Sequence, residues 1–245
     1  MTIFRDYFTE KIKDFNIYHT NLLFQTTEND IHRLRTSIKK LRTFNTLLDG
    51  LLFRYKDFPQ GFKEVFKLTG EIRDIQIQQN VLKDIDSKYK SYLIYSCQDK
   101  ISKFKIKDNF DLEIQYLEDK LSMVENYHID EQIINNIKTH IKIIYNEILD
   151  MVKNISPDNL HDIRKKIKRI YYIKLMLGDK VDIKKFLDIQ ETIGLWHDCD
   201  VTIENIKNLN LREIDDNDYK TIEILSKKRE VLYDDSIKLL NSIII

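Results

Sequence analysis

Apolar side chains recur every three or four residues along nearly the whole chain of 245 residues. This spacing places them on one face of an α-helix. Only five Gly and two Pro interrupt the pattern, so few segments favour turns. The pattern predicts an all-α protein with helices near 4–25, 29–54, 60–86, 88–106, 110–127, 130–153, 157–178, 182–209 and 214–242.

Several predicted helix ends coincide with residues that start or stop helices. Asp30 can cap the second helix, and Ser156-Pro157-Asp158 provides a start for the seventh. Phe58-Pro59-Gln60-Gly61 breaks the chain between helices, and Gly178 can end the seventh helix.

The middle of the chain contains no long linker, although 42% hydrophobic content suffices for one large core or two small ones. We therefore expect a single domain that covers residues 1–245. Its two helical halves would be about 1–115 and about 116–245, with the boundary within 107–130.

Positive charge is concentrated in two windows. Residues 31–48 contain five Lys or Arg, one His and no carboxylate, and residues 163–178 contain six Lys or Arg and no carboxylate. The whole chain has 40 basic and 40 acidic residues, so the remainder is acidic.

Like charges one helical turn apart repel by about 0.2–0.5 kcal/mol per pair. A cationic stripe of roughly 15 Å therefore favours an extended polyanion over a solvated helix face.

A helical wheel divides each window into a packing face and a cationic face. The apolar residues are Ile31, Leu34, Ile38, Leu41 and Leu48 on the first helix, and Leu160, Ile163, Ile167, Ile170, Ile173 and Leu177 on the second, which begins before its window. The cationic faces contain His32, Arg35, Lys39 and Arg42 on the first helix, and His161, Arg164, Lys165, Lys168 and Tyr172 on the second. Superposing the two windows gives a constant offset of 129 residues, which indicates an internal repeat.

A matched segment follows each basic window. Residues 70–74 read Gly-Glu-Ile-Arg-Asp, and residues 194–198 read Gly-Leu-Trp-His-Asp. A Gly inside a helix costs about 1 kcal/mol relative to Ala, so we expect another helix to cross closely at Gly70 and at Gly194.

The residues that follow each Gly add candidate ligands. Arg73 and His197 lie on nearly the same helix face as the Gly and could reach into a cleft beside the crossing. Asp74 and Asp198 could orient a neighbouring Arg, Lys or His, and structural ion pairing is the alternative for both.

Other features of the chain exclude some classes of protein. The N-terminus has charges throughout and no apolar core, unlike a secretory signal. No stretch of 18 residues is uncharged enough to span a bilayer. Cys97 and Cys199 lack metal-ligand spacing and are too few for a disulfide scaffold. We expect a cytoplasmic protein with no cofactor and no metal.

The order of these motifs resembles the conserved-histidine α-helical domain, CHAD. The residues that carry the resemblance are His32-Arg33-Leu34-Arg35 with Lys39-Lys40-Leu41-Arg42, Gly70 with Arg73-Asp74, His161 with Arg164 and Lys168-Arg169-Ile170-Tyr171-Tyr172, and Gly194 with Asp198. It covers nearly the whole chain. Two positions depart from the family pattern: Lys39-Lys40 stands where Arg is usual, which loses the bidentate fork, and Tyr171 replaces an Arg.

The resemblance implies two pseudo-symmetric four-helix bundles whose basic helices line a shared cleft. It also implies binding of inorganic polyphosphate without catalysis, and an association with polyphosphate granules. Phosphate, sulfate or nucleotides would bind weakly. Arg side chains would engage phosphate oxygens through planar forks, and Lys side chains would act as point charges. A phosphate beside His32 or His161 would favour the charged imidazole, so binding should strengthen on mild acidification and weaken with salt.

Three alternatives use the same residues. A metal-dependent phosphohydrolase similar to the HD enzymes would take ligands from His32, Asp74, His161-Asp162 and His197-Asp198, but the surrounding cations would repel a metal ion. Nucleic-acid binding shares the basic groove, but single strands need aromatic stacking platforms, and only Tyr171 and Tyr172 are available. An acidic protein partner could also occupy the basic surface.

Overall fold

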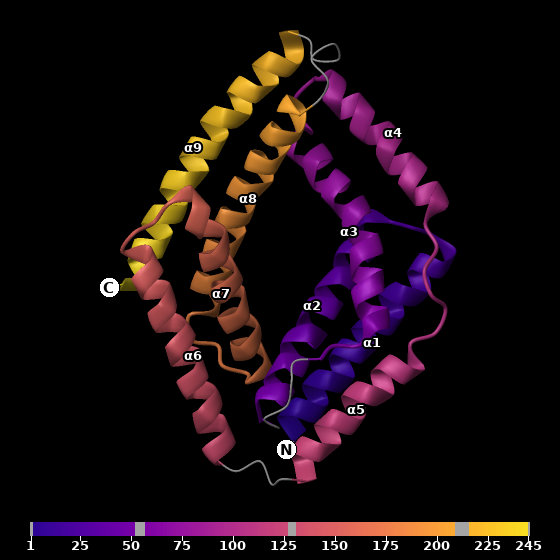
Figure 1. Cartoon of the computed structure of the whole chain (residues 1–245), viewed down its shortest axis with the longest axis vertical. Helices are drawn as coiled ribbons and strands as arrows, with labels where there is room; N and C mark the ends of the chain where they lie inside the picture. The colour runs from indigo at the N-terminus through magenta and orange to yellow at the C-terminus, as the bar shows by residue number, and fades with distance from the viewer. Residues whose placement is uncertain (1, 52–56, 127–130, 209–215, 245) are drawn as a thin grey trace. The chain divides into compact units, whose positions relative to one another are not determined.

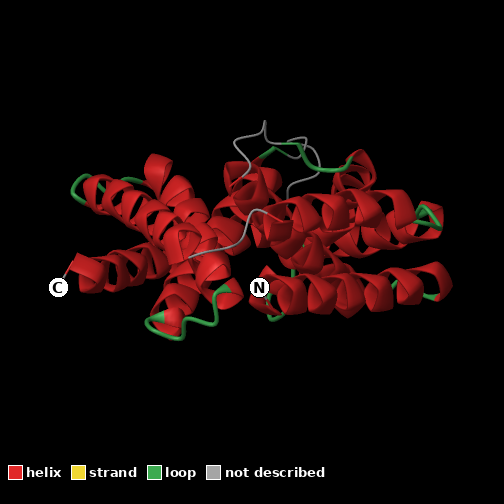
Figure 2. Ribbon diagram, turned by 90° about the horizontal axis from the view of Figure 1, so that it is seen from below, coloured by secondary structure: helices red, strands yellow, loops and turns green. Residues whose placement is uncertain are grey.

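The computed structural model describes residues 2–51, 57–126, 131–208 and 216–244. In these ranges the chain forms nine helices and no strand (Figure 1, Figure 2). The helices are α1 (Thr2–Phe24), α2 (Glu28–Leu51), α3 (Gln60–Val81), α4 (Lys88–Lys103), α5 (Asp111–Asn126), α6 (Glu131–Val152), α7 (Pro157–Met176), α8 (Ile183–Lys207) and α9 (Asp216–Ile244).

The all-α prediction is confirmed for the described residues, and each predicted helix corresponds to one helix of the structure. The largest difference at a described end is in α3, which stops at Val81 and not near residue 86. The ends predicted near 54, 127, 130, 209 and 214 lie outside the described residues.

The two basic helices, α2 and α7, each follow a hydroxyl residue, Thr27 or Ser156, but differ in the hydrogen bond that caps them. The Asp30 N–H donates to Thr27 Oγ1 at 3.1 Å, so Thr27 caps α2, and the prediction of Asp30 as the cap was wrong. Asp30 instead lies in the first turn, where a carboxylate interacts favourably with the helix N-terminus. At the start of α7, the Ser156 N–H donates to Asn159 Oδ1 at 3.0 Å. Thr27 and Ser156 are 129 residues apart, the offset of the predicted repeat, which stays a prediction.

Gly178 ends α7 as predicted. Its φ of 67° is in the left-handed region, which Gly adopts without steric cost. The Gly178 N–H donates to Leu175 O at 3.2 Å, and the Asp179 N–H donates to Lys174 O at 3.0 Å. These two bonds form a Schellman motif that satisfies carbonyls of the last helical turn.

Close approaches between Cα atoms divide the chain into two compact units. The first comprises Met1–Arg73, Lys103–Ile143 and Tyr172–Val181, and the second comprises Asp74–Ser102, Ile144–Tyr171 and Asp182–Ile245. Each unit takes segments from both predicted halves, so this division differs from the expected one near residue 115. The shared basic cleft stays a prediction.

Aromatic packing fixes α1 and α2 in the first unit, where the two helices contact each other. The Phe8 and Phe44 rings stack with centroids 5.6 Å apart. Phe15 of α1 lies edge-on to Phe62 of α3, with centroids 5.0 Å apart. The core thus orients the basic face of α2 away from the packed side.

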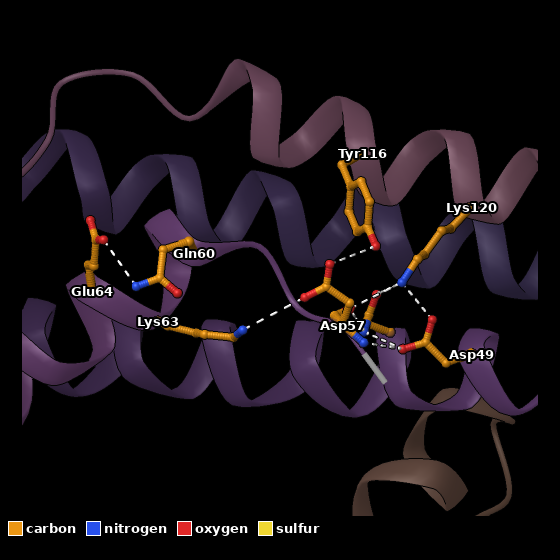
Figure 3. A network of polar contacts seen from close by, with 8 residues as sticks. Asp49, Asp57, Gln60, Lys63, Glu64, Tyr116 and Lys120 are labelled. Carbon is orange, nitrogen blue, oxygen red and sulfur yellow. Dashed lines mark hydrogen bonds and ion pairs between the residues drawn. The ribbon is translucent and has the colours of Figure 1, made fainter. Parts of the chain in front are cut away.

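The first unit also contains a buried polar network that joins α2, α5 and Asp57 (Figure 3). Lys120 Nζ donates to Asp49 Oδ1 at 2.5 Å, Asn45 Oδ1 at 3.0 Å and the Asp57 carbonyl at 3.1 Å. The Lys120 and Asp49 side chains are 5% and 0% exposed. Three acceptors satisfy the three donors of the ammonium, so this buried charge is both paired and hydrogen-bonded.

In the second unit, α8 and α9 pack along each other. The Trp196 and Tyr233 rings have centroids 6.2 Å apart, and Arg229 Nη1 lies 2.8 Å from Asp200 Oδ1. The predicted packing face of α7 is buried: Leu160, Ile163, Ile167 and Ile170 are all 0% exposed.

The described helices include none that combines the length and apolar character needed to cross a membrane. Cys97 and Cys199 are buried free thiols.

Candidate functional site

The basic face of α2 forms with α3 a first cationic surface. The predicted packing residues of α2 are buried, including Ile31, Leu34 and Leu41 at 0% exposed. On the opposite face, His32 and Arg42 are exposed, and Arg35 and Lys39 are half-buried. We call this the α2–α3 surface, defined by His32, Arg35, Lys39, Arg42 and Arg73.

Arg35 is held over α3 at Gly70. Its Nη1 donates to the Phe66 carbonyl and lies 3.4 Å from Thr69 Oγ1, and its Cζ lies 4.0 Å from the centroid of the Phe66 ring. A Cβ atom at Gly70 would be 2.9 Å from Nη1. The glycine therefore admits the guanidinium of Arg35 from the neighbouring helix α2.

The other residues of the α2–α3 surface have partners of their own. Arg73 Nη1 donates to Glu28 Oε1 at 2.8 Å. Lys39 Nζ lies 5.6 Å from the Phe66 ring centroid, and Arg42 Cζ lies 5.8 Å from that of Phe58, so both cations border aromatic rings.

His32 and Asp74 complete the predictions for this region. Partial desolvation, followed by the positive charges of Arg73, Lys39 and Arg33, lowers the pKa of His32. Cations thus surround this imidazole. Asp74 is exposed, and its backbone carbonyl accepts a hydrogen bond from Gln78 Nε2 at 3.2 Å.

The second unit repeats the arginine arrangement on α7 and α8. Arg164 Nε donates to the Gln190 carbonyl at 2.9 Å. A Cβ atom at Gly194 would lie 2.6 Å from Arg164 Nη2 and 3.2 Å from its Cζ. As with Arg35 and Gly70, the acceptor belongs to the residue four positions before the glycine. We call this the α7–α8 surface, defined by His161, Arg164, Lys165, Lys168 and His197.

Two imidazoles meet on this surface. The rings of His161 and His197 have centroids 4.5 Å apart and are tilted by 43°. Desolvation is the main cause that lowers the pKa of each ring, and the positive charge of Arg164 lowers both further. Asp198 partly opposes the change in the pKa of His197.

The two lysines of the α7–α8 surface differ in environment. Lys165 is exposed, and its Nζ lies 2.9 Å from Asp162 Oδ1. Burial, followed by the positive charge of Arg164, lowers the pKa of Lys168 to about 8, although Asp198 acts in the opposite direction. The charge of Asp198 thus acts on both Lys168 and His197, and its predicted supporting role stays a prediction.

Tyr172 is half-buried and is assigned to the first compact unit, whereas the residues of the α7–α8 surface are assigned to the second. Its predicted place in the site stays a prediction. Sequence patterns did not predict the roles of Phe66, Glu28 and the two carbonyl acceptors. Glu28 lies four residues before His32, a spacing that places it on the same helix face, so this neighbour could have been found.

Electrostatically, both surfaces combine Arg, Lys and His, which donate hydrogen bonds to anionic oxygens. Within the described residues, no three or more His, Cys, Asp or Glu side chains are grouped so as to hold a metal ion. The hydrogen-bond donors and positive charges of the two surfaces are suited chemically to an anion.

Taken together, the described residues define an all-helical protein with two cationic helix pairs. Neither a scan against protein-family models nor a search of curated proteins finds a match to this sequence. Among solved structures, the fold is similar to that of the CHAD domain from the plant Ricinus communis, with a TM-score of 0.72 and 14% sequence identity. The match covers 98% of this chain and 91% of the plant chain. The chain therefore has a CHAD-like fold, and the family recognised in the sequence is confirmed at the level of the fold.

Proposed function

We propose that this protein binds inorganic polyphosphate without catalysis, through the α2–α3 and α7–α8 surfaces. The proposal rests on the duplicated arrangement in which an arginine from a basic helix is anchored over a glycine of the next helix. The resemblance to CHAD domains, supported by the fold, indicates polyphosphate as the ligand.

The anchored arginines are the geometric basis of the proposal. A guanidinium is planar and rigid, so a hydrogen bond at one edge restricts the positions that the whole group can take. Arg35 and Arg164 are anchored in this way by equivalent carbonyls. Each therefore presents a preorganised cation, and less conformational entropy is lost when an anion binds.

The shape of the ligand follows from the spacing of the cations. The charged residues occur at intervals of one helical turn on α2 and on α7, and a linear phosphate polymer offers oxygens at repeated intervals. It has no bases or sugars to read, so recognition depends on charge and on hydrogen-bond donors. The two basic windows would then be functional copies of one internal repeat.

Nucleic acid and a phosphohydrolase substrate are the competing ligands. Phe66 borders Arg35 and Lys39, but its face is already in contact with the guanidinium of Arg35, which makes it a poor platform for stacking a base. Phosphate release from polyphosphate and from nucleotides, assayed with added divalent metals, tests the hydrolase.

Exposed cations provide the variants that test binding. Arg35 and Arg164 are unsuitable, because their replacement would also remove contacts between helices. We therefore choose Arg42→Glu combined with Lys165→Glu, one exposed residue from each surface.

The matched control is Lys83→Glu combined with Lys153→Glu, which changes the net charge equally. Lys153 is 70% exposed and pairs with Asp150 three residues away, as Lys165 pairs with Asp162. Retention on immobilised polyphosphate should weaken in the first variant and not in the control. The slope of log affinity against log salt should fall by about 0.7 per lost contact, the value for single-stranded nucleic acids. Equal retention of both variants would refute these surfaces as the site.

The same chemistry predicts weak binding of phosphate, sulfate and nucleotides, because each presents fewer oxygens to the cations. We also propose that the protein is cytoplasmic and associates with polyphosphate granules. Fluorescence microscopy of a tagged protein, with the Arg42→Glu and Lys165→Glu variant as control, tests this localisation.

A further inference from the structure

The two surfaces differ at the position three residues after the glycine. In the first unit this residue is Arg73, whose guanidinium pairs with Glu28. In the second unit it is His197, whose ring lies against His161 with centroids 4.5 Å apart. His161 Nδ1 is buried and has no hydrogen-bond partner in the described structure. Where the α2–α3 surface has Arg73, which is always charged, the α7–α8 surface thus has a pair of imidazoles that can be neutral or charged.

The surroundings of the pair contain charges of both signs. On α7 these are Asp162, Arg164 and Lys165, and on α8 they are Asp198 and Asp200. From α9, Arg229 pairs with Asp200, and Tyr233 lies against Trp196, the residue beside His197. The nearby carboxylates favour protonation of the imidazoles, whereas the nearby cations and the partial burial oppose it.

Two protonated rings at this separation repel each other, so the pair takes up its first proton more readily than its second. A bound anion adds negative charge beside the rings and favours the protonated form. A protonated imidazole also converts its acceptor nitrogen into a donor toward a phosphate oxygen. Anion binding and proton binding must therefore assist each other.

We infer that the His161–His197 pair makes the α7–α8 surface a proton-coupled anion site, in which a phosphate oxygen binds with uptake of one proton by the pair. This inference rests on the proposed function and adds to it a pH-dependent regulation of one of the two surfaces. At the equivalent position of the α2–α3 surface, Arg73 keeps its charge throughout the physiological range.

His197→Arg tests the inference, because it places at residue 197 the side chain found at the equivalent position of the first unit. Long-chain polyphosphate is the probe, since each internal phosphate keeps its charge between about pH 5.5 and about pH 7.5, the range in which His titrates.

For wild type, the affinity should rise as the pH falls, by up to about tenfold per pH unit for one proton. The rise should be smaller in His197→Arg, because the pair is lost and only His32 and His161 can still take up a proton beside the ligand. The control His140→Gln, which removes a histidine of α6, should keep the wild-type dependence. A full wild-type dependence in His197→Arg would overturn the inference.

A second measurement keeps the test independent of the variant and of polyphosphate. Histidine ring signals of the wild-type protein can be followed by NMR against pH, with and without sulfate, whose charge is constant in this range. The expected result is a joint titration of His161 and His197 that moves to higher pH when sulfate is added. Independent titrations that sulfate does not change would refute the inference. If sulfate moves the titration but polyphosphate is not retained at any pH, the proposed ligand is wrong and the proton-coupled site stands.

Discussion

The replacement Gly194→Ala separates the role of the anchored arginine from the cost of a glycine inside a helix. A Cβ atom at this position would lie 2.6 Å from Arg164 Nη2, 3.2 Å from Cζ and 3.3 Å from Nε. Nonbonded atoms do not approach so closely, so the guanidinium must move. Because it is the flexible end of a long side chain, we expect it to leave the Gln190 carbonyl without disturbing the backbone of α8.

Two contributions of opposite sign determine the change in the free energy of unfolding. A hydrogen bond from a charged donor contributes about 1.5–3 kcal/mol, and Arg164 is half-buried, so the lower end of this range applies. Alanine is favoured over glycine in a helix by about 1 kcal/mol. The net expectation is a destabilisation of about 0.5 kcal/mol, although helix propensity alone predicts a stabilisation of about 1 kcal/mol.

Gly50→Ala provides the matched control, because Gly50 also lies in a helix and a Cβ there would meet no atom within 4 Å. This variant should gain up to about 1 kcal/mol. Urea denaturation of wild type and both variants measures the difference between the two alanines, which we expect to be about 1.5 kcal/mol. Gly194→Ala should also bind polyphosphate more weakly, since Arg164 loses its fixed position. If both variants are stabilised equally, the guanidinium–carbonyl bond contributes nothing, and the structural basis of the proposed site is wrong.

Two further predictions concern lysines in contrasting environments. Lys120→Met leaves the carboxylate of Asp49, which is 0% exposed, without its ammonium, and should destabilise the protein by about 3 kcal/mol or more. Lys63→Met, whose Nζ lies 3.8 Å from Asp57 Oδ1 at the surface, should change stability by about 0.5 kcal/mol at most, and equal urea midpoints would contradict this difference. Lys168, with its pKa lowered to about 8, should lose its proton above that pH, so polyphosphate affinity should fall between about pH 8 and about pH 9. Lys168→Arg stays charged, and its affinity should remain nearly constant over that range; an identical fall in both proteins would exclude Lys168 from the site.

The helices were predictable because their signals are local. Apolar residues at helical spacing predict the buried face of α7, and Ser156-Pro157 predicts its start. The error at Asp30 was also local, since Thr27 and Asp30 are both good capping residues and only the structure shows which hydrogen bond forms. Patterns of this kind need only neighbouring residues to be interpreted.

The anchoring of the arginines was not predictable in the same way. A basic residue on a helical wheel indicates a direction but not a partner, so the sequence pattern predicted only a ligand-binding role for Arg35 and Arg164. The structure adds backbone carbonyls of the next helix as acceptors. Both glycines were predicted to mark a helix crossing, and the atoms that a Cβ would meet there belong to a guanidinium from the neighbouring basic helix. Such contacts depend on how two helices pack, which spacing along one helix does not specify.

The anchored arginines are the same on both surfaces, whereas the residue three positions after each glycine is Arg73 on one and His197 on the other. These two features affect the pH dependence of anion binding differently. Arg35 and Arg164 keep a fixed positive charge at any working pH, so the anchors alone give both surfaces a constant affinity for anions. Arg73 adds a second fixed charge to the α2–α3 surface, although Glu28 partly neutralises it. His197 adds a charge to the α7–α8 surface only when a proton is bound. Two surfaces that share this anchor but differ in this side chain can therefore bind the same polyanion, while the α7–α8 surface, with His161 and His197 against His32 alone, responds more strongly to pH.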